Sequence, residues 1–249
     1  MARTKRRTAT QQAADRLRAI VLDAPEGTLI GSEDSLVTRL ECSRSTVRQT
    51  ARLLEREGLL KVRRGINGGY FGTRPTAETI ESTLGAHLEA LNVDGHDTTT
   101  MATALWVVAV RSASNAEAAE IRAVVDRVTR KLKSLDENAG FGKVRELDLM
   151  IQNEIFSLAR SPYIKLIFDV NVTFSRRHFG IPAENDANPA HAAFVNAWRE
   201  AKLMEMNAMA SGNENLAGVA AQHARKVWID RIKQRHAVMA SEAKAAGTA

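Results

Sequence analysis

Apolar residues recur mostly three and four positions apart along this chain, a spacing that places them on one face of an α-helix. In the first third this pattern predicts three helices, over Thr8–Leu22, Ser32–Leu40 and Arg44–Glu57. A weakly alternating stretch, Leu59 to Arg64, then meets a glycine-rich turn and a short return strand. The order of elements is therefore helix, helix, helix, hairpin.

Strand signals almost vanish beyond Arg74-Pro75-Thr76, a predicted linker in which proline favours extended geometry. Amphipathic helices are expected over Ala77–Leu91, Thr98–Ser112, Asn115–Asp136, Lys143–Ala159, Pro162–Phe179, Pro189–Ala210 and Asn215–Ala240. Seven helices in succession are typical of an all-α bundle. We therefore predict a mostly α chain with an N-terminal domain over residues 1–75 and a helical domain over residues 76–249.

Charge is divided unevenly between these two parts. Residues 1–75 carry 15 Lys and Arg against 8 Asp and Glu, a net of +7, and the remaining residues carry 20 against 21, a net of −1. A basic tail, Arg3 to Arg7, supplies only four of the 15 cations. A basic module joined to a near-neutral body suits binding to the phosphate backbone of nucleic acid, although a solvated charged face is the simpler alternative.

Several classes of protein are disfavoured. The longest apolar run, Met101 to Val110, is too short to cross a bilayer, which needs about 20 residues. No apolar stretch follows the basic start, so we expect no signal peptide and a cytoplasmic protein without a membrane partner. The single Cys42 allows no intrachain disulfide. Catalytic motifs are not recognisable, and we expect a protein that is not an enzyme.

The third predicted helix carries the strongest candidate chemistry. Two helices joined by a tight turn form a helix-turn-helix, whose second helix presents its first residues to base edges in the major groove. Arginine pairs with guanine or phosphate, glutamine suits adenine, and the threonine methyl suits the thymine methyl. Together with the hairpin, the candidate DNA-binding residues are Arg44, Ser45, Thr46, Arg48, Gln49, Arg52, Arg64 and Gly68.

The run from Leu29 to Phe71 resembles the winged helix of GntR-family bacterial transcription regulators. The shared features are Leu29-Ile-Gly-Ser-Glu-Asp-Ser-Leu-Val, then Cys42-Ser-Arg-Ser-Thr-Val-Arg-Gln-Thr-Ala, then Leu53-Leu-Glu-Arg-Glu-Gly-Leu. The resemblance implies DNA contacts from Arg44, Thr46, Arg48 and the wing around Gly68. One position departs from the pattern: Asp34 stands where the family often has a DNA-contacting arginine, and an acid facing phosphate is repulsive.

The helical part is similar, more weakly, to the FadR-like (FCD) subfamily, in the run from Asp148 to Pro162 and in the segment from Gly212 to His223. Many members of that subfamily hold a divalent metal with an Asp, a His four residues later and two further His. Here Asp148 and His223 fit, but Gln152 occupies the second position and the third falls near Ala201 or Lys202. Imidazole and carboxylate are the ligands such metals need, so we predict no metal cofactor, with a divalent metal at a degraded site as the alternative.

The surviving polar positions predict a pocket for a small-molecule effector. Asp148 and Gln152 share a helix face, His223 is expected to face them from the last helix, and Arg176 suits an anionic ligand. The resulting hypothesis is a homodimeric transcription regulator, most simply a repressor, that binds double-stranded DNA and responds to an effector. The alternative is a sequence-tolerant, nucleoid-like DNA-binding protein whose helical domain only dimerises.

Overall fold

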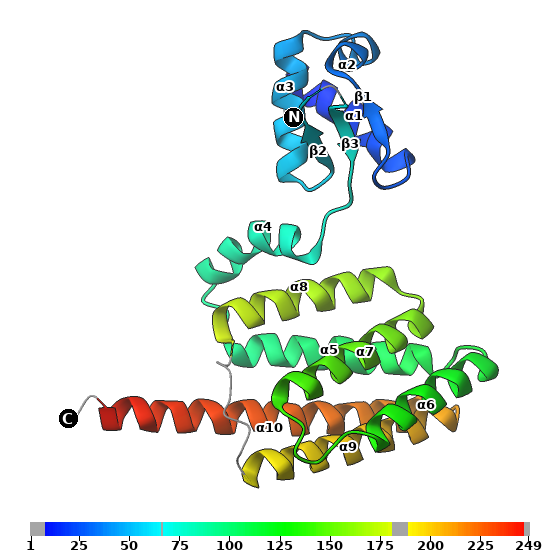
Figure 1. Cartoon of the computed structure of the whole chain (residues 1–249), viewed down its shortest axis with the longest axis vertical. Helices are drawn as coiled ribbons and strands as arrows, with labels where there is room; N and C mark the ends of the chain where they lie inside the picture. The colour runs from blue at the N-terminus through cyan, green and yellow to red at the C-terminus, as the bar shows by residue number, and fades with distance from the viewer. Residues whose placement is uncertain (1–7, 66, 181–188, 247–249) are drawn as a thin grey trace, which may run out of the picture. The chain divides into compact units, whose positions relative to one another are not determined.

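The computed structural model describes residues 8–65, 67–180 and 189–246, and it divides the chain into two compact units, Met1–Glu89 and Ala90–Ala249 (Figure 1). Their boundary follows Glu89, so the helix that begins at Ala77 is grouped with the first unit. The boundary expected after residue 75 stays a prediction. No helix among the described residues is both long and apolar enough to span a bilayer.

The first unit is a winged helix-turn-helix. Its elements are α1 (Ala9–Asp23), β1 (Leu29–Gly31), α2 (Glu33–Leu40), α3 (Arg44–Arg56), β2 (Leu60–Arg63), β3 (Gly69–Gly72) and α4 (Ala77–Ala90). The strands form an antiparallel sheet in the order β1-β3-β2, with Val62 opposite Tyr70. The sequence predicted the β2–β3 hairpin and the three helices, but it gave no signal for β1.

Side chains from α1, α2, α3 and the sheet form one hydrophobic core. Leu17, Leu36, Val47 and Leu54 are fully buried there, and burial of each such side chain stabilises the fold by roughly 1.5–3 kcal/mol. Gly58 follows α3 with φ +71°, a left-handed conformation that glycine adopts without strain, and so the chain turns from α3 into β2. The core fixes α3 with its opposite face in solvent.

The second unit is a bundle of helices. It comprises α5 (Gly95–Ala113), α6 (Ala118–Lys133), α7 (Phe141–Ala159), α8 (Pro162–Phe179), α9 (Pro189–Ala210) and α10 (Glu214–Ala246). α10 packs along α9 and α5, while α5 also contacts α7 and α8. Trp106 lies at the centre, against Phe156 and Phe168. The predicted fold class, a winged helix followed by a helical bundle, is confirmed.

Candidate nucleic-acid interface and effector pocket

The exposed face of α3 begins at a well-formed cap. The Ser43 hydroxyl accepts a hydrogen bond from the Thr46 backbone N–H at 3.2 Å, which fixes the first turn of the helix. Because Val47, Ala51 and Leu54 point into the core, the predicted contact residues lie on the solvent side. Arg44, Ser45, Arg48, Gln49 and Arg52 are exposed, and Thr46 is half-buried.

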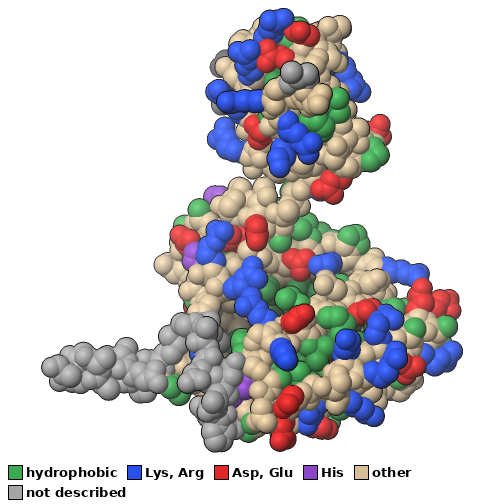
Figure 2. All heavy atoms as spheres, viewed as in Figure 1, with side chains coloured by type: hydrophobic (Ala, Val, Ile, Leu, Met, Phe, Trp, Pro, Cys, Tyr) green, Lys and Arg blue, Asp and Glu red, His purple; other side chains and the backbone are tan. Residues whose placement is uncertain are grey.

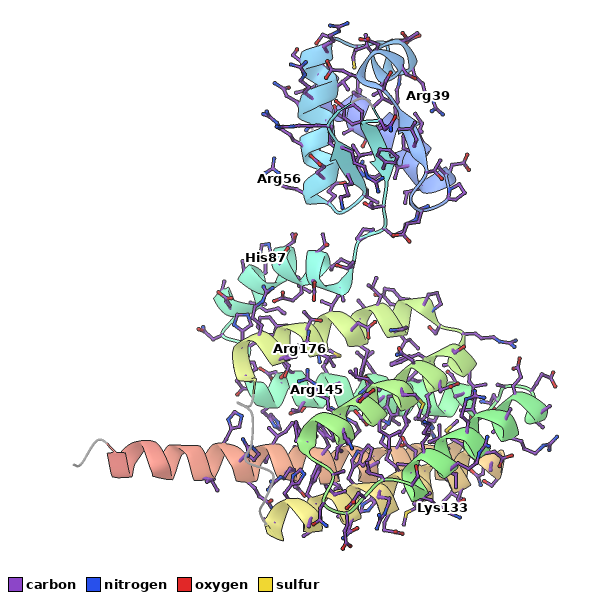
Figure 3. The ribbon with its side chains drawn as sticks, viewed as in Figure 1. Arg39, Arg56, His87, Lys133, Arg145 and Arg176 are labelled. Carbon is purple, nitrogen blue, oxygen red and sulfur yellow. The ribbon has the colours of Figure 1, made fainter. Side chains whose placement is uncertain are left out.

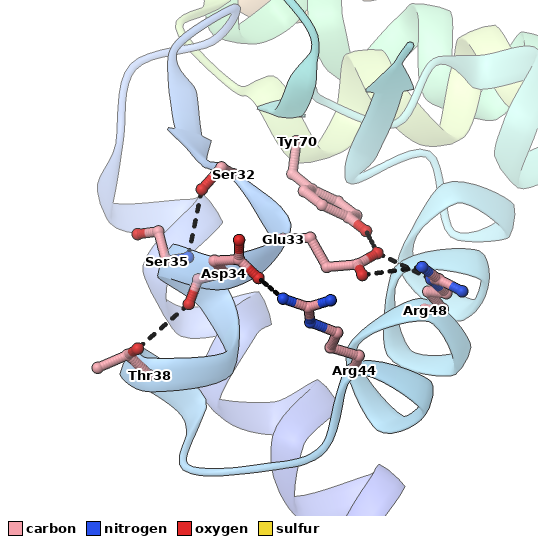
Figure 4. Close-up of polar contacts among 8 residues, drawn as sticks. All are labelled: Ser32, Glu33, Asp34, Ser35, Thr38, Arg44, Arg48 and Tyr70. Carbon is pink, nitrogen blue, oxygen red and sulfur yellow. Dashed lines mark hydrogen bonds and ion pairs between the residues drawn. The ribbon is translucent and has the colours of Figure 1, made fainter. Parts of the chain in front are cut away.

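Both leading arginines of α3 are paired with acids at the start of α2 (Figure 4). Arg44 Nη2 donates to Asp34 Oδ1 at 2.7 Å, and these side chains are 66% and 75% exposed. Arg48 makes a bidentate ion pair with Glu33: its Nε donates to Oε2 at 2.8 Å and its Nη2 donates to Oε1 at 2.9 Å. The exposed Arg44–Asp34 pair contributes little to stability, so another anion can replace Asp34 at small cost, whereas the Glu33 side chain is only 26% exposed.

Glu33 is a residue of this face that the sequence did not single out. Its carboxylate also accepts a hydrogen bond from the Tyr70 hydroxyl at 3.4 Å, so it links α2, α3 and β3. The hydrogen bonds from Arg48 lower the pKa of Glu33. Burial of the phenol raises the pKa of Tyr70, and the Glu33 carboxylate adds to that increase. Arg48 is therefore held in a defined position on the exposed face of α3.

The wing is a tight hairpin in which glycine is required. A Cβ on Gly68 would lie 2.5 Å from the Arg63 carbonyl oxygen and 2.7 Å from the Gly65 carbonyl oxygen, closer than atoms can approach. Arg63 stacks over the Phe71 ring at 4.4 Å, and Arg64 is exposed. In Figure 2, Lys and Arg side chains gather on the side of the first unit formed by α3.

A separate pocket of about 260 Å³ lies within the second unit; we call it the polar pocket after the charged and amide side chains in its lining, which also contains many apolar side chains. Asp148 and Gln152 share a face of α7, as predicted from their spacing, and Gln152 Nε2 donates to Asp148 Oδ2 at 2.7 Å. Arg145 from α7 and Arg176 from α8 line the same opening (Figure 3). Three of the four expected effector residues, Asp148, Gln152 and Arg176, are therefore together.

His223 is not with them. It is exposed, and it lines two other hollows, of about 830 Å³ and 550 Å³. Successive residues of an α-helix are rotated by about 100°, so positions 223 and 225 of α10 point to nearly opposite sides. The prediction that His223 faces Asp148 is wrong, and α10 lines the polar pocket with Arg225, Trp228 and Ile232 instead.

A buried lysine lies beside this pocket. Lys202 on α9 is 3% exposed, and its Nζ is 2.9 Å from Glu205 Oε2 and 3.7 Å from Asp148 Oδ1. Glu205 also accepts a hydrogen bond from the Trp106 indole at 2.7 Å, and the ammonium lies 4.5 Å from the Trp106 ring centroid. A Lys and a Glu three residues apart on a largely apolar helix were the signal available in the sequence.

The donor set does not fit a divalent metal. Within residues 8–65, 67–180 and 189–246, no three His, Cys, Asp or Glu side chains come together as metal ligands. The two acids nearest the pocket, Asp148 and Glu205, are already engaged by the Lys202 ammonium, whose charge repels a cation. Gln152 supplies an amide where an imidazole would be needed.

Comparison with known proteins gives a match at the level of structure only. No family model and no curated protein matches the sequence. The Streptococcus agalactiae GntR structure aligns with a TM-score of 0.66 and 17% identity, over 88% of this chain and 97% of that one. E. coli McbR/YncC aligns with a TM-score of 0.43 and 13% identity, over 92% and 99% of the two chains. The first of these shows a shared fold.

Proposed function

We propose that this chain is a DNA-binding transcription regulator of the GntR type, with a repressor's role at the promoters it occupies. The observation that carries the proposal is the exposed face of α3, where Arg44 and Arg48 project from the first two turns of a capped helix. A helix of this kind enters the major groove with its N-terminal residues toward the bases. The wing adds Arg64 and a close approach of the backbone at Gly68.

We propose further that the helical unit forms a homodimer and that a small anionic molecule in the Asp148–Arg176 pocket alters operator affinity. Two identical subunits read two half-sites about one helical turn apart. A ligand changes the affinity only by its differential binding to the two arrangements of the subunits. The role requires no catalytic residue, and the proposal includes none.

The test is a fluorescence anisotropy titration of the full-length protein with duplexes from the region upstream of its own gene and with scrambled duplexes, at one fixed salt concentration. The upstream duplex should bind at least about 1000-fold more tightly than the scrambled duplex. Comparable affinities would favour the sequence-tolerant, nucleoid-like alternative, and absence of binding would contradict both.

A pair of variants makes the same experiment specific to α3. Arg48→Ala should weaken binding to the upstream duplex by about 1–3 kcal/mol, because the guanidinium hydrogen bonds to a base or a phosphate are lost. Arg56→Ala is the matched control: it removes another exposed arginine, from the last turn of the same helix. Equal losses in both variants would show that only general charge matters.

A further inference from the structure

The polar pocket of the helical unit has more positive than negative charge. Its lining and immediate surroundings contain the cations Arg145, Arg176, Lys202 and Arg225 and the acids Asp148 and Glu205. The excess is two positive charges. The whole unit, Ala90–Ala249, carries 20 Lys and Arg against 18 Asp and Glu, a net of +2, so the charges outside the pocket balance. The excess is therefore a property of this pocket rather than of the surface around it.

The two acids are already satisfied by groups of the protein. Glu205 accepts from Trp106 Nε1 and pairs with Lys202, and Asp148 accepts from Gln152 and lies 3.7 Å from the same ammonium. Lys202 thus occupies the position between two buried carboxylates that a divalent cation would otherwise need. A second cation there would be repelled by the buried Lys202 ammonium, because burial weakens the screening of that repulsion by solvent.

The guanidinium groups, unlike the acids, have unused hydrogen-bonding capacity. The Nε of Arg225 is buried, and no hydrogen-bond partner exists for it within the described residues. Burial lowers the pKa of Arg225, and Asp148 and Glu205 oppose that shift. Arg145 and Arg176, also in the described part of the chain, make no ion pair with the residues around them. Arg145 and Arg176 are exposed, whereas the buried, unpaired Nε of Arg225 is costly, so the pocket favours an acceptor.

We propose that this pocket binds a small doubly charged oxyanion directly through Arg225 and Arg176, with the Lys202 ammonium in place of a divalent metal. The inference rests on the effector role proposed above and gives it a chemistry. Arginine forks donate two parallel hydrogen bonds to a carboxylate or a phosphate, so either group fits the donors. The cavity of about 260 Å³ limits the ligand to the size of a small metabolite.

A thermal-shift experiment on the full-length protein tests this without DNA. The protein is treated with EDTA, and malonate or inorganic phosphate is added at a few millimolar and constant ionic strength, with neutral malonamide as the uncharged analogue. At least one dianion should raise Tm by about 2–6 °C and malonamide should not. If neither anion raises the Tm of the EDTA-treated protein, the proposal is wrong, even where protein without EDTA shows a rise.

Two arginine variants separate site binding from the general stabilisation that such salts give. Arg176→Met should abolish the anion-dependent rise. Arg177→Met, which removes the adjacent exposed arginine of α8 outside the pocket, should retain it. A rise of the same size in both variants would overturn the proposal, because it would come from the salt and not from the pocket.

Metal content is measured on the same preparation after dialysis against Zn²⁺ or Ni²⁺ and then against buffer. We expect far less than one equivalent per chain, and retention of about one equivalent would overturn the proposal. Failure of the DNA titration would remove the regulatory role and leave these anion and metal results standing. Failure of the anion shift would leave DNA binding intact.

Discussion

At the scale of single residues, Asp34 shows how a departure from a family pattern changes the chemistry of an interface. The sequence alone predicted repulsion between this acid and DNA phosphate. The structure shows in addition that Asp34 pairs with Arg44 at 2.7 Å, so under the proposed function the acid competes with DNA for this arginine. Both side chains are largely exposed, so the competition is weak rather than absolute.

Asp34→Asn should therefore strengthen DNA binding by about two- to fivefold, as expected for loss of an exposed ion pair. Glu41→Gln is the matched control, since Glu41 pairs with Arg16 at 3.4 Å in the same unit with similar exposure. Anisotropy titrations of both variants give the comparison. If the two substitutions strengthen binding equally, the gain is a net-charge effect and the competition for Arg44 is refuted.

The polar residues of the helical unit mark the limit of what spacing predicts. The separation of Asp148 and Gln152 by one turn correctly placed them together, because that relation is local to one helix. The partner from α10 was predicted as His223 and is Arg225, a shift of two positions that reverses the face of the helix. Lys202 and Glu205 were missed because burial of charge depends on how three helices pack, which one sequence does not reveal.

At the scale of elements, the helices were predictable and the smallest strand was not. The observed α7, α8 and α9 begin and end within two residues of the expected ranges, because their apolar spacing and flanking breaks are both clear. β1 has three residues and depends on pairing with β3, which lies about forty residues later in the chain. Its formation is decided by tertiary contact, and no alternating pattern marks it.

The wing gives a prediction that belongs to an element rather than to a residue. Gly68→Ala should widen the β2–β3 turn, because the new Cβ meets two backbone carbonyl oxygens that cannot move independently. We expect DNA binding to weaken about tenfold, with the melting temperature lowered by only a few degrees, since the turn lies outside the core.

Asn67→Ala is the control for this change, because Asn67 is an exposed neighbour in the same turn. Circular dichroism melting and the DNA titration are measured on both variants. An Asn67→Ala loss as large as that of Gly68→Ala would show that the side chain at position 67, and not the backbone path, makes the wing functional.

At the scale of the whole molecule, charge and function are divided between the two units. Residues 1–75, which lie in the first unit, carry a net of +7 and the rest of the chain carries −1, so the proposed function assigns the electrostatic part of DNA binding to the first unit. Each neutralised phosphate releases a counterion, so the logarithm of the binding constant should fall linearly with the logarithm of the salt concentration, with a slope of about −0.9 per contact.

Arg64→Gln should reduce the magnitude of that slope by about 1 for each subunit bound. Lys233→Gln, an exposed position of α10, should leave it unchanged, whatever it does to the hollow beside it. The measurement is a set of anisotropy titrations between about 50 and 300 mM salt. An equal change of slope in the two variants would mean that the helical unit also contacts the phosphate backbone. The assignment of the phosphate contacts to the first unit would then be wrong.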